Sequence, residues 1–314
     1  MLAKVVSILL PIFFIMGLGY ASGRFGILGD NSAPILNRFV TQFSLPLLLF
    51  GALAGSPLDQ TFNLAFFVSF GAASFVCFLL PLVLLPRRDA GIQKRAMRGL
   101  GASFPSVSFV GIPLLTPIVG ALALPAVGVS NIISLTVLAI AMLILELARS
   151  GTGSFLTALR TALFHTFKNP MILAMLCGAA YSMSGWPLPE WIHRTTQIIG
   201  AATPAVALFA MGEALVKSRL AGLGEIGLLT AVKLVAMPLI TMGVLLLFPD
   251  VDPKWAVSAV LMAALSTAVL DYIVASEYHE DVQEASDLVL LTTLLSAATL
   301  PVFIILSLRI WPIA

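Results

Sequence analysis

The stretch GLGASFPSVSFVGIPLLTPIVG, from Gly99 to Gly120, combines the length of a membrane-spanning helix with residues that break helices. About 20 apolar residues cross ~30 Å of hydrocarbon as a helix. Pro105, Pro113 and Pro117 each remove a backbone hydrogen bond and clash with the preceding turn. Backbone groups freed in this way need partners within the protein, because lipid offers none. We therefore expect a broken helix here, with a proline kink packed by serines as the alternative.

The rest of the chain is equally apolar. Of its 314 residues, 59% are hydrophobic and 10% are charged, whereas a soluble chain carries about 25% charged residues. The mean hydropathy is +1.04. This composition excludes a water-soluble enzyme, and the apolar runs are too long and too uniform for the alternating strands of a membrane β-barrel. We predict an all-α polytopic membrane protein.

Apolar runs between polar breaks predict ten transmembrane helices. They cover approximately residues 5–22, 33–53, 63–86, 99–119, 125–148, 168–185, 195–216, 226–248, 255–276 and 286–308. The connectors leave no room for a soluble domain, so any activity must lie within the helix bundle. The first run resembles a signal peptide, but its apolar stretch of about 17 residues favours a retained helix.

Basic residues in the connectors predict the orientation, because Lys and Arg are enriched on the cytoplasmic side. If the 87–98 loop is cytoplasmic, that side holds Arg24, Arg87, Arg88, Lys94, Arg95, Arg98, Arg149, Arg160, Lys168, Lys217 and Arg219. The opposite side then holds Lys4, Arg194, Lys254 and Arg309. We therefore expect both termini to lie outside the cytoplasm.

The two halves of the sequence resemble each other. SLPLLLFGALAG at 44–55 is matched by ATPAVALFAMGEAL at 202–215, and SFPSVSFVG in the fourth span by ALSTAVLDY in the ninth. Each half holds five predicted spans, so the second half must enter the membrane upside down relative to the first. This predicts a 5+5 inverted repeat of residues 1–150 and 151–314. Such repeats, with a site at the midplane between interrupted helices, are typical of secondary transporters.

Polar residues near the two breaks are the candidate substrate ligands. Free backbone amides and the positive end of a half-helix can hold a carboxylate. The candidates are Ser103, Pro105, Ser106, Ser108, Gly111 and Asn131 from the first half and Ser266, Thr267 and Tyr272 from the second. The amide of Asn131 is able to orient a substrate, although hydrogen bonding between helices explains it equally well.

Two charged residues inside predicted spans are the candidate ion-coupling groups. An Asp inside a membrane helix costs ~3 kcal/mol on insertion scales, so Asp271 is a candidate proton carrier or cation ligand. Alternatively, it lies near the cytoplasmic end, salt-bridged or wetted by the acidic loop that follows. We expect Lys233 to snorkel to the interface, with Asp271, Glu213 or an anionic substrate as its alternative partner. Glu146 and Glu213, at predicted helix ends, are weaker candidates.

Several other classes of function are not supported by the sequence. It contains no phosphate-binding loop, H-E-x-x-H or G-x-S-x-G motif. His165, His193 and His279 fall in or beside different loops, so we expect no metal site or cofactor beyond H⁺ or Na⁺ as a coupling ion. Cys77 and Cys177 lie in apolar runs as small hydrophobes. A net charge of +2 gives no reason to expect a nucleic-acid partner.

Six segments of the sequence resemble the auxin efflux carrier family in order and spacing. They are LPIFFIMGLGYASGRFGIL, LNRFVTQFSLPLLLFGAL, FVGIPLL, KNPMILAMLCG, TPAVALFAMGEAL and LLTTLLSAATLPV. The likeness covers essentially the whole chain and points to the compact bacterial type, whose members include malonate and malate permeases. It implies a secondary carrier of a small organic anion, a carboxylate, in the bacterial inner membrane.

The resemblance also implies how the helices are divided. The first, second, sixth and seventh spans would form a scaffold, and the third to fifth and eighth to tenth a transport domain that moves as an elevator. Spans four and nine would be broken and would cross at the site. The G-x-x-x-G patterns GYASG and GALAG indicate close packing or dimerisation, and we expect a homodimer through spans one, two and seven. Alternatives are sodium-coupled symport of the bile-acid symporter type and a membrane ligand sensor.

The sequence departs from the family pattern at both breaks. The family has Asn-x-Gly-Phe-x-Gly-x-Pro in span four, whereas this chain has SVSFVGIP from Ser106 to Pro113 and lacks the Asn. In span nine the usual Pro-Thr-Ala becomes STA, starting at Ser266, and Leu270 replaces a usual Asn. We therefore expect the second break to be softer than the first, and the substrate or coupling to differ from the better-known members.

Overall fold

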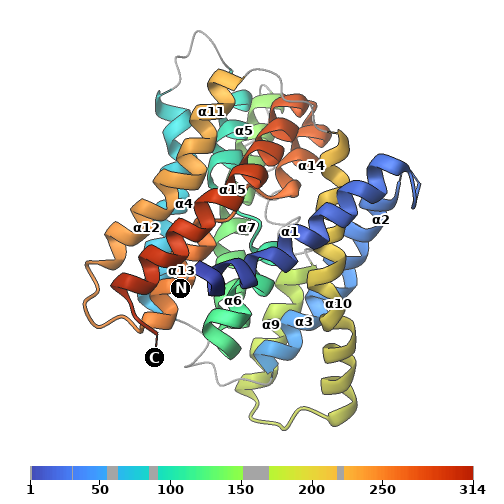
Figure 1. Ribbon diagram of the computed structural model, residues 1–314, viewed down its shortest axis with the longest axis vertical. Coiled ribbons are helices and arrows are strands. Elements are labelled where there is room, and N and C mark those ends of the chain that lie inside the picture. The colour runs from blue at the N-terminus through green and yellow to red at the C-terminus, as the bar shows by residue number, and fades with distance from the viewer. Residues whose placement is uncertain are drawn as a thin grey trace. The chain divides into compact units, whose positions relative to one another are not determined.

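The computed structural model describes residues 2–29, 31–54, 63–84, 91–150, 170–217 and 223–313. In these ranges the regular structure is helical, as Figure 1 shows. The exception is an isolated antiparallel bridge between Pro105 and Thr267. The predicted all-α class is confirmed. Of the residues used above, Gly55, Arg87, Arg88, Arg160, His165, Lys168 and Arg219 lie outside the described residues, as do the side chains of Lys4, Glu146, Arg149 and Lys217.

Within the described part of the chain, six segments are long and apolar enough by themselves to cross a membrane. They are Ser32–Gly51, Leu64–Val83, Val107–Leu145, Glu190–Ala214, Gly224–Leu245 and Val282–Ile310. These segments fit a multi-pass membrane protein. The full set of ten spans and its 5+5 inverted repeat stay predictions.

Contacts divide the chain into two compact units. The first unit consists of Met1–Leu64, Val107–Val129 and Phe167–Val216, and the second of Ala65–Ser106, Ser130–Thr166 and Lys217–Ala314. Each unit therefore takes segments from both halves of the sequence.

The first unit is organised around close helix pairs. Its helical segments are α1 (Leu2–Phe25), α2 (Ser32–Phe39), η1 (Val40–Ser44), α3 (Leu45–Ala54), η3 (Val107–Gly111), α6 (Ile112–Val119), η4 (Gly120–Leu122), α9 (Pro170–Met183) and α10 (Glu190–Ala214), with η5 (Leu215–Lys217) at its end. Helix α1 packs along α10, and α3 packs along α9. A Cβ at Gly19 would overlap the carbonyl of Phe209. The GYASG motif thus serves packing within the chain.

The second unit surrounds a central helix. Its helices are α4 (Leu64–Leu84), α5 (Ile92–Ser103), most of α7 (Ala123–Ser150), α11 (Leu223–Ala231), η6 (Val232–Ala236), α12 (Met237–Leu245), α13 (Pro253–Ala263), α14 (Val269–Tyr278) and α15 (Val282–Ile310). Every residue of α13 from Trp255 to Ala263 is buried. A helix that is buried on all sides belongs to the core of a unit, and α12 and α15 pack against α13.

Candidate functional site

Two helices of the second unit, α5 and α13, are each followed by a short non-helical segment, after which the chain becomes helical again. Helix α5 ends at Ser103, and the chain is extended at Phe104 before helical structure returns at Val107. Helix α13 ends at Ala263, and the next helix, α14, begins at Val269. We call residues 104–106 the first break and residues 264–268 the second break.

The two breaks supply each other's backbone hydrogen bonds. The amide of Ser106 donates to the carbonyl of Ser266 at 2.9 Å, and the amide of Ala268 donates to the carbonyl of Phe104 at 3.0 Å. Pro105 has no amide hydrogen of its own and interrupts the first helix locally. We call the place where these two breaks meet, residues 104–106 and 264–268, the crossing. Backbone groups that a continuous helix would have satisfied are satisfied between the two breaks there, as a membrane interior requires.

Thr267 fastens the crossing to two further helices. Its hydroxyl donates to the carbonyl of Gly101 on α5 at 2.8 Å, and its amide donates to the hydroxyl of Thr292 on α15 at 3.1 Å. Both threonines are fully buried. The hydroxyl of Ser103 is also used internally, because it donates to the carbonyl of Gly99 at 2.7 Å. At the predicted substrate site, these hydroxyl groups donate their hydrogens to backbone carbonyls of the protein itself.

The predicted substrate ligands are divided between the two units. The crossing brings together Ser103, Pro105, Ser106, Ser266 and Thr267, all of them buried. In the same unit, Asn131 is buried on α7 and Tyr272 is half-buried on α14. The remaining two candidates, Ser108 and Gly111, lie on η3 in the first unit.

Asp271 lies in the first turn of α14, directly after the second break. Its side chain is 1% exposed, and within the described residues its Oδ1 has no hydrogen-bond partner. The positive end of the α14 dipole favours a carboxylate at this position. Gly101 leaves room for it, since a Cβ there would lie 3.0 Å from Oδ2 of Asp271. Asp271 forms no ion pair within the part of the chain that the structure describes, but it shares a pocket with Asp281 and Glu284 of the acidic segment that follows α14.

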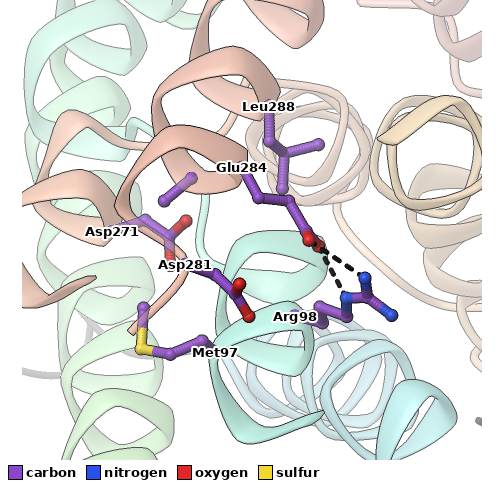
Figure 2. A pocket seen from close by; sticks show the side chains of 7 residues that line it. Met97, Arg98, Asp271, Asp281, Glu284 and Leu288 are labelled. Atoms are coloured by element: carbon purple, nitrogen blue, oxygen red, sulfur yellow. Dashed lines mark hydrogen bonds and ion pairs between the residues drawn. The ribbon is translucent and has the colours of Figure 1, made fainter. Parts of the chain in front are cut away.

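A small pocket connects Asp271 with Arg98 in the middle of α5 and with Asp281 and Glu284 at the start of α15. Its lining consists of Met97, Arg98, Asp271, Asp281, Glu284, Ala285 and Leu288 (Figure 2). Three of these seven side chains are carboxylates and one is a guanidinium. The lining is therefore suited to protons or small cations rather than to anions.

Arg98 is held on one side of this pocket by carboxylates. Its Nε and Nη2 donate to the two carboxylate oxygens of Glu284 at 2.6 and 2.9 Å, as Figure 2 shows, and Nη2 also donates to Glu225. Arg98 precedes the predicted span 99–119. Burial lowers the pKa of its guanidinium, but the hydrogen bonds and charges of Glu284 and Glu225 outweigh that effect, so the pKa lies above its ordinary value. Lys94 pairs with Asp281 at 3.1 Å.

Lys233 is buried in η6, and the expectation that it snorkels to the interface is wrong. The residue is 0% exposed, and its Nζ donates to the carbonyl of Ala263 at 2.8 Å. The Sδ of Met237 lies 3.3 Å from the same nitrogen. Within the described residues no carboxylate pairs with it. Its ammonium therefore caps the end of α13 instead of reaching water.

Glu213, one of the two weaker candidates, lies in the first unit. It is buried on α10, and the hydroxyl of Ser32 donates to its Oε1 at 2.5 Å. Its position on α10 is consistent with a carboxylate that ties α10 to α2.

Sequence reasoning missed the roles of Arg98, Glu284, Gly101 and Thr292 in this site. Arg98 was counted as a loop residue, and Glu284 as part of an acidic loop. Nothing in a single sequence pairs side chains that lie so far apart along the chain. The small size of Gly101 was a usable signal, since glycine in a membrane helix commonly marks a close approach.

The helices, the crossing and the buried charges define a membrane-embedded protein built around interrupted helices, the arrangement of a transporter. The chain belongs to the membrane transport protein family, whose model matches residues 4–304. This finding confirms the resemblance to auxin efflux carriers. Because the family and the relatives below are transporters, the protein is a membrane transporter and not an enzyme.

The chain is similar to curated relatives along nearly its whole length. It is 28% identical over 308 residues to the "Putative malonate transporter" of Rhizobium meliloti (strain 1021), covering 95% of this chain and 94% of that protein. It is 26% identical over 315 residues to the "Uncharacterized transporter YfdV" of Escherichia coli (strain K12), covering 98% and 99%. An "Uncharacterized transporter" of Methanothermobacter thermautotrophicus is 25% identical over 305 residues, covering 94% and 95%.

Proposed function

We propose that the protein is a secondary active transporter that moves a small organic anion, a carboxylate, across the bacterial inner membrane. The observation that carries this proposal is the crossing, where two interrupted helices share hydrogen bonds between residues 104–106 and 266–268. Interrupted helices place half-helix ends and free backbone groups where a substrate can be bound within the membrane. The name of the Rhizobium meliloti relative supports a dicarboxylate such as malonate as the first substrate to test.

In this proposal the substrate carboxylate binds near the crossing. The first turn of α14 offers the positive end of the helix dipole and amides that lack an i−4 partner, although the amide of Asp271 already donates to the carbonyl of Ala268 at 3.0 Å. Ser106 and Ser266 share a backbone hydrogen bond there, and we include both hydroxyls in the proposed set. Pro105 and Gly111 shape the backbone, and Ser103, Ser108, Asn131, Thr267 and Tyr272 complete the proposed set of binding residues.

Asp271 is the proposed coupling group. Its buried carboxylate has an oxygen without a hydrogen-bond partner in the described residues, and it lines the pocket that also contains Asp281 and Glu284. A proton entering through this pocket would neutralise Asp271 and make its burial less costly. Proton symport is therefore the proposed coupling. Sodium symport of the bile-acid symporter type is the second candidate, because the same carboxylates attract cations.

The proposed movement is an elevator. The first unit contains α1, α2, α3, α9 and α10, as expected for a scaffold of spans one, two, six and seven, but it also contains η3 and α6 of span four. The second unit, which holds all the proposed binding residues except Ser108 and Gly111, would then be the transport domain. We also propose the 5+5 inverted repeat, both termini outside the cytoplasm, and a homodimer through spans one, two and seven. Because Gly19 is occupied by contacts with α10, the dimer would use other faces of α1.

The test is uptake of radiolabelled malonate, malate and succinate into liposomes that contain the purified protein. An inward proton gradient should drive accumulation of at least one of these acids, and removing sodium should leave that accumulation unchanged. Asp271→Asn should abolish the response to the gradient, whereas Glu190→Gln, in an exposed pair on α10, should not. Binding without accumulation would contradict transport and favour a ligand sensor.

A further inference from the structure

Lys233 places a basic side chain at the end of an interrupted helix. Its Nζ donates to the carbonyl of Ala263, the last residue of α13, at 2.8 Å. The second break follows directly, at residues 264–268. The side chain is completely buried, and within the described residues it forms no ion pair. The cost of burying such a side chain requires an explanation.

The position of the ammonium supplies that explanation. The last carbonyls of a helix lack intrahelical partners and form the negative end of the helix dipole. In transporters with interrupted helices, such ends and the unwound carbonyls beside them coordinate the coupling cation. Here the end of α13 is already occupied by the amino group of Lys233, whose hydrogens are donors.

Backbone satisfaction alone does not account for a charge at this place. At the first break, the carbonyl of Gly101 accepts a hydrogen bond from the neutral hydroxyl of Thr267. The carbonyl of Leu100 accepts one from the amide of Phe104. Hydroxyl and amide groups therefore suffice at the end of α5, whereas a lysine amino group binds the end of α13.

We propose that Lys233 is the resident cation of the crossing: its ammonium holds the place of a sodium ion at the end of α13. Anion binding then needs no added sodium. This inference rests on the proposed function, in which a carboxylate binds at the crossing. It separates the two coupling candidates, because the site that the end of α13 would offer to sodium is filled by the chain itself.

The test compares Lys233→Ala, which leaves a space at the end of α13, with Lys233→Met, which fills the space without charge. Malonate binding to purified protein is titrated in choline, sodium and methylammonium chloride. Wild type should bind equally in all three. Lys233→Ala should bind about tenfold or more weakly in choline, a loss of ~1.4 kcal/mol per factor of ten, and recover in sodium or methylammonium. Lys233→Met should be weak in every salt, whereas the exposed control Lys254→Ala should match wild type.

A second readout does not require a substrate. Sodium or methylammonium should raise the apparent melting temperature of Lys233→Ala above its value in choline, and should leave wild type and Lys233→Met unchanged. If wild type binds none of the acids but this pattern holds, the substrate proposal fails and the resident cation stands. If Lys233→Ala does not fold, Lys233→Gln keeps a donor for the Ala263 carbonyl and should weaken binding without rescue by any salt.

Two results would overturn the inference. One is a wild type that requires sodium for binding. The other is a Lys233→Ala or Lys233→Gln protein that binds malonate like wild type in choline, since the lysine would then be only a structural cap.

Discussion

The two breaks of the second unit interrupt their helices by different means. The first break contains Pro105 and is surrounded by neutral groups, whereas the second contains no proline and stands between Lys233 and Asp271. Even so, the second break extends over residues 264–268 and the first over 104–106. The second break is therefore the longer of the two although it lacks a proline, and the expectation that it is softer stays a prediction. A proline is not needed for a break when hydrogen bonds from the other break satisfy the freed backbone groups.

The two breaks also differ in which side chains lie beside them. Bonds between hydroxyl and backbone groups define the crossing, while both ionisable side chains buried beside it, Lys233 and Asp271, belong to the second break. On α5, the helix of the first break, the buried charge is Arg98, which lies earlier in the helix and faces the pocket. Four substitutions therefore test separate contributions to the two breaks: a charge, the space between the breaks, one hydrogen bond and the proline.

Arg98→Gln should have the largest effect on stability. Breaking a fully buried ion pair costs ~3–5 kcal/mol. Because Glu284 is 17% exposed, we expect about 2–3 kcal/mol, measured as a lower apparent melting temperature in detergent. In the control Arg194→Gln both partners are exposed, so the cost should stay below about 0.5 kcal/mol. Equal losses in the two variants would show that α5 does not depend on a buried anchor.

Gly101→Ala should come next, because it adds volume where the two breaks meet. The new Cβ would lie 2.5 Å from Cδ2 of Leu288 and 3.0 Å from Oδ2 of Asp271. Overpacking of this kind costs about 1–3 kcal/mol. The control Gly227→Ala on α11 meets no atom within 4 Å and should be neutral or slightly stabilising, since alanine favours helix. Unchanged melting of Gly101→Ala would mean that Asp271 is not held against α5.

Thr267→Val should have a smaller effect, because it keeps the shape of the side chain and removes one donor. The carbonyl of Gly101 would lose its bond from the Thr267 hydroxyl, at a cost of about 1–2 kcal/mol for a buried unsatisfied group. Thr136→Val is the matched control, because that exposed hydroxyl bonds only within its own helix. If both variants melt alike, the hydroxyl of Thr267 does not stabilise the crossing.

The sequence predicted those features of the site that arise from local chemistry. Pro105 and the glycines around it predicted a break, and a carboxylate in an apolar run singled out Asp271. The partners of these groups were not predictable, because contacts between distant segments decide them. The depth of Lys233 along its own helix suggested the interface, yet its bond is to the end of α13, a different helix. Similarly, Arg98 pairs with Glu284 only after folding brings α5 and α15 together.

Pro105→Ala should have the smallest effect and tests the central claim of the comparison. If hydrogen bonds between the breaks maintain the interruption, alanine should cost less than about 1 kcal/mol, mainly by giving the unfolded chain more freedom. The geometry can be checked in a variant whose two native cysteines are replaced. Residues opposite each other across an antiparallel bridge have Cα atoms ~4.5–5.5 Å apart, within reach of a disulfide.

Ser106→Cys and Ser266→Cys should therefore cross-link to the same extent with proline or with alanine at position 105, since these residues share the backbone bond between the breaks. The pair Thr136→Cys and Ser266→Cys provides a background level, because Thr136 is an exposed residue of α7. If alanine at position 105 abolishes the cross-link and lowers stability by several kcal/mol, the proline itself imposes the first break. The two breaks would then differ in cause as well as in charge, because the second one forms without a proline.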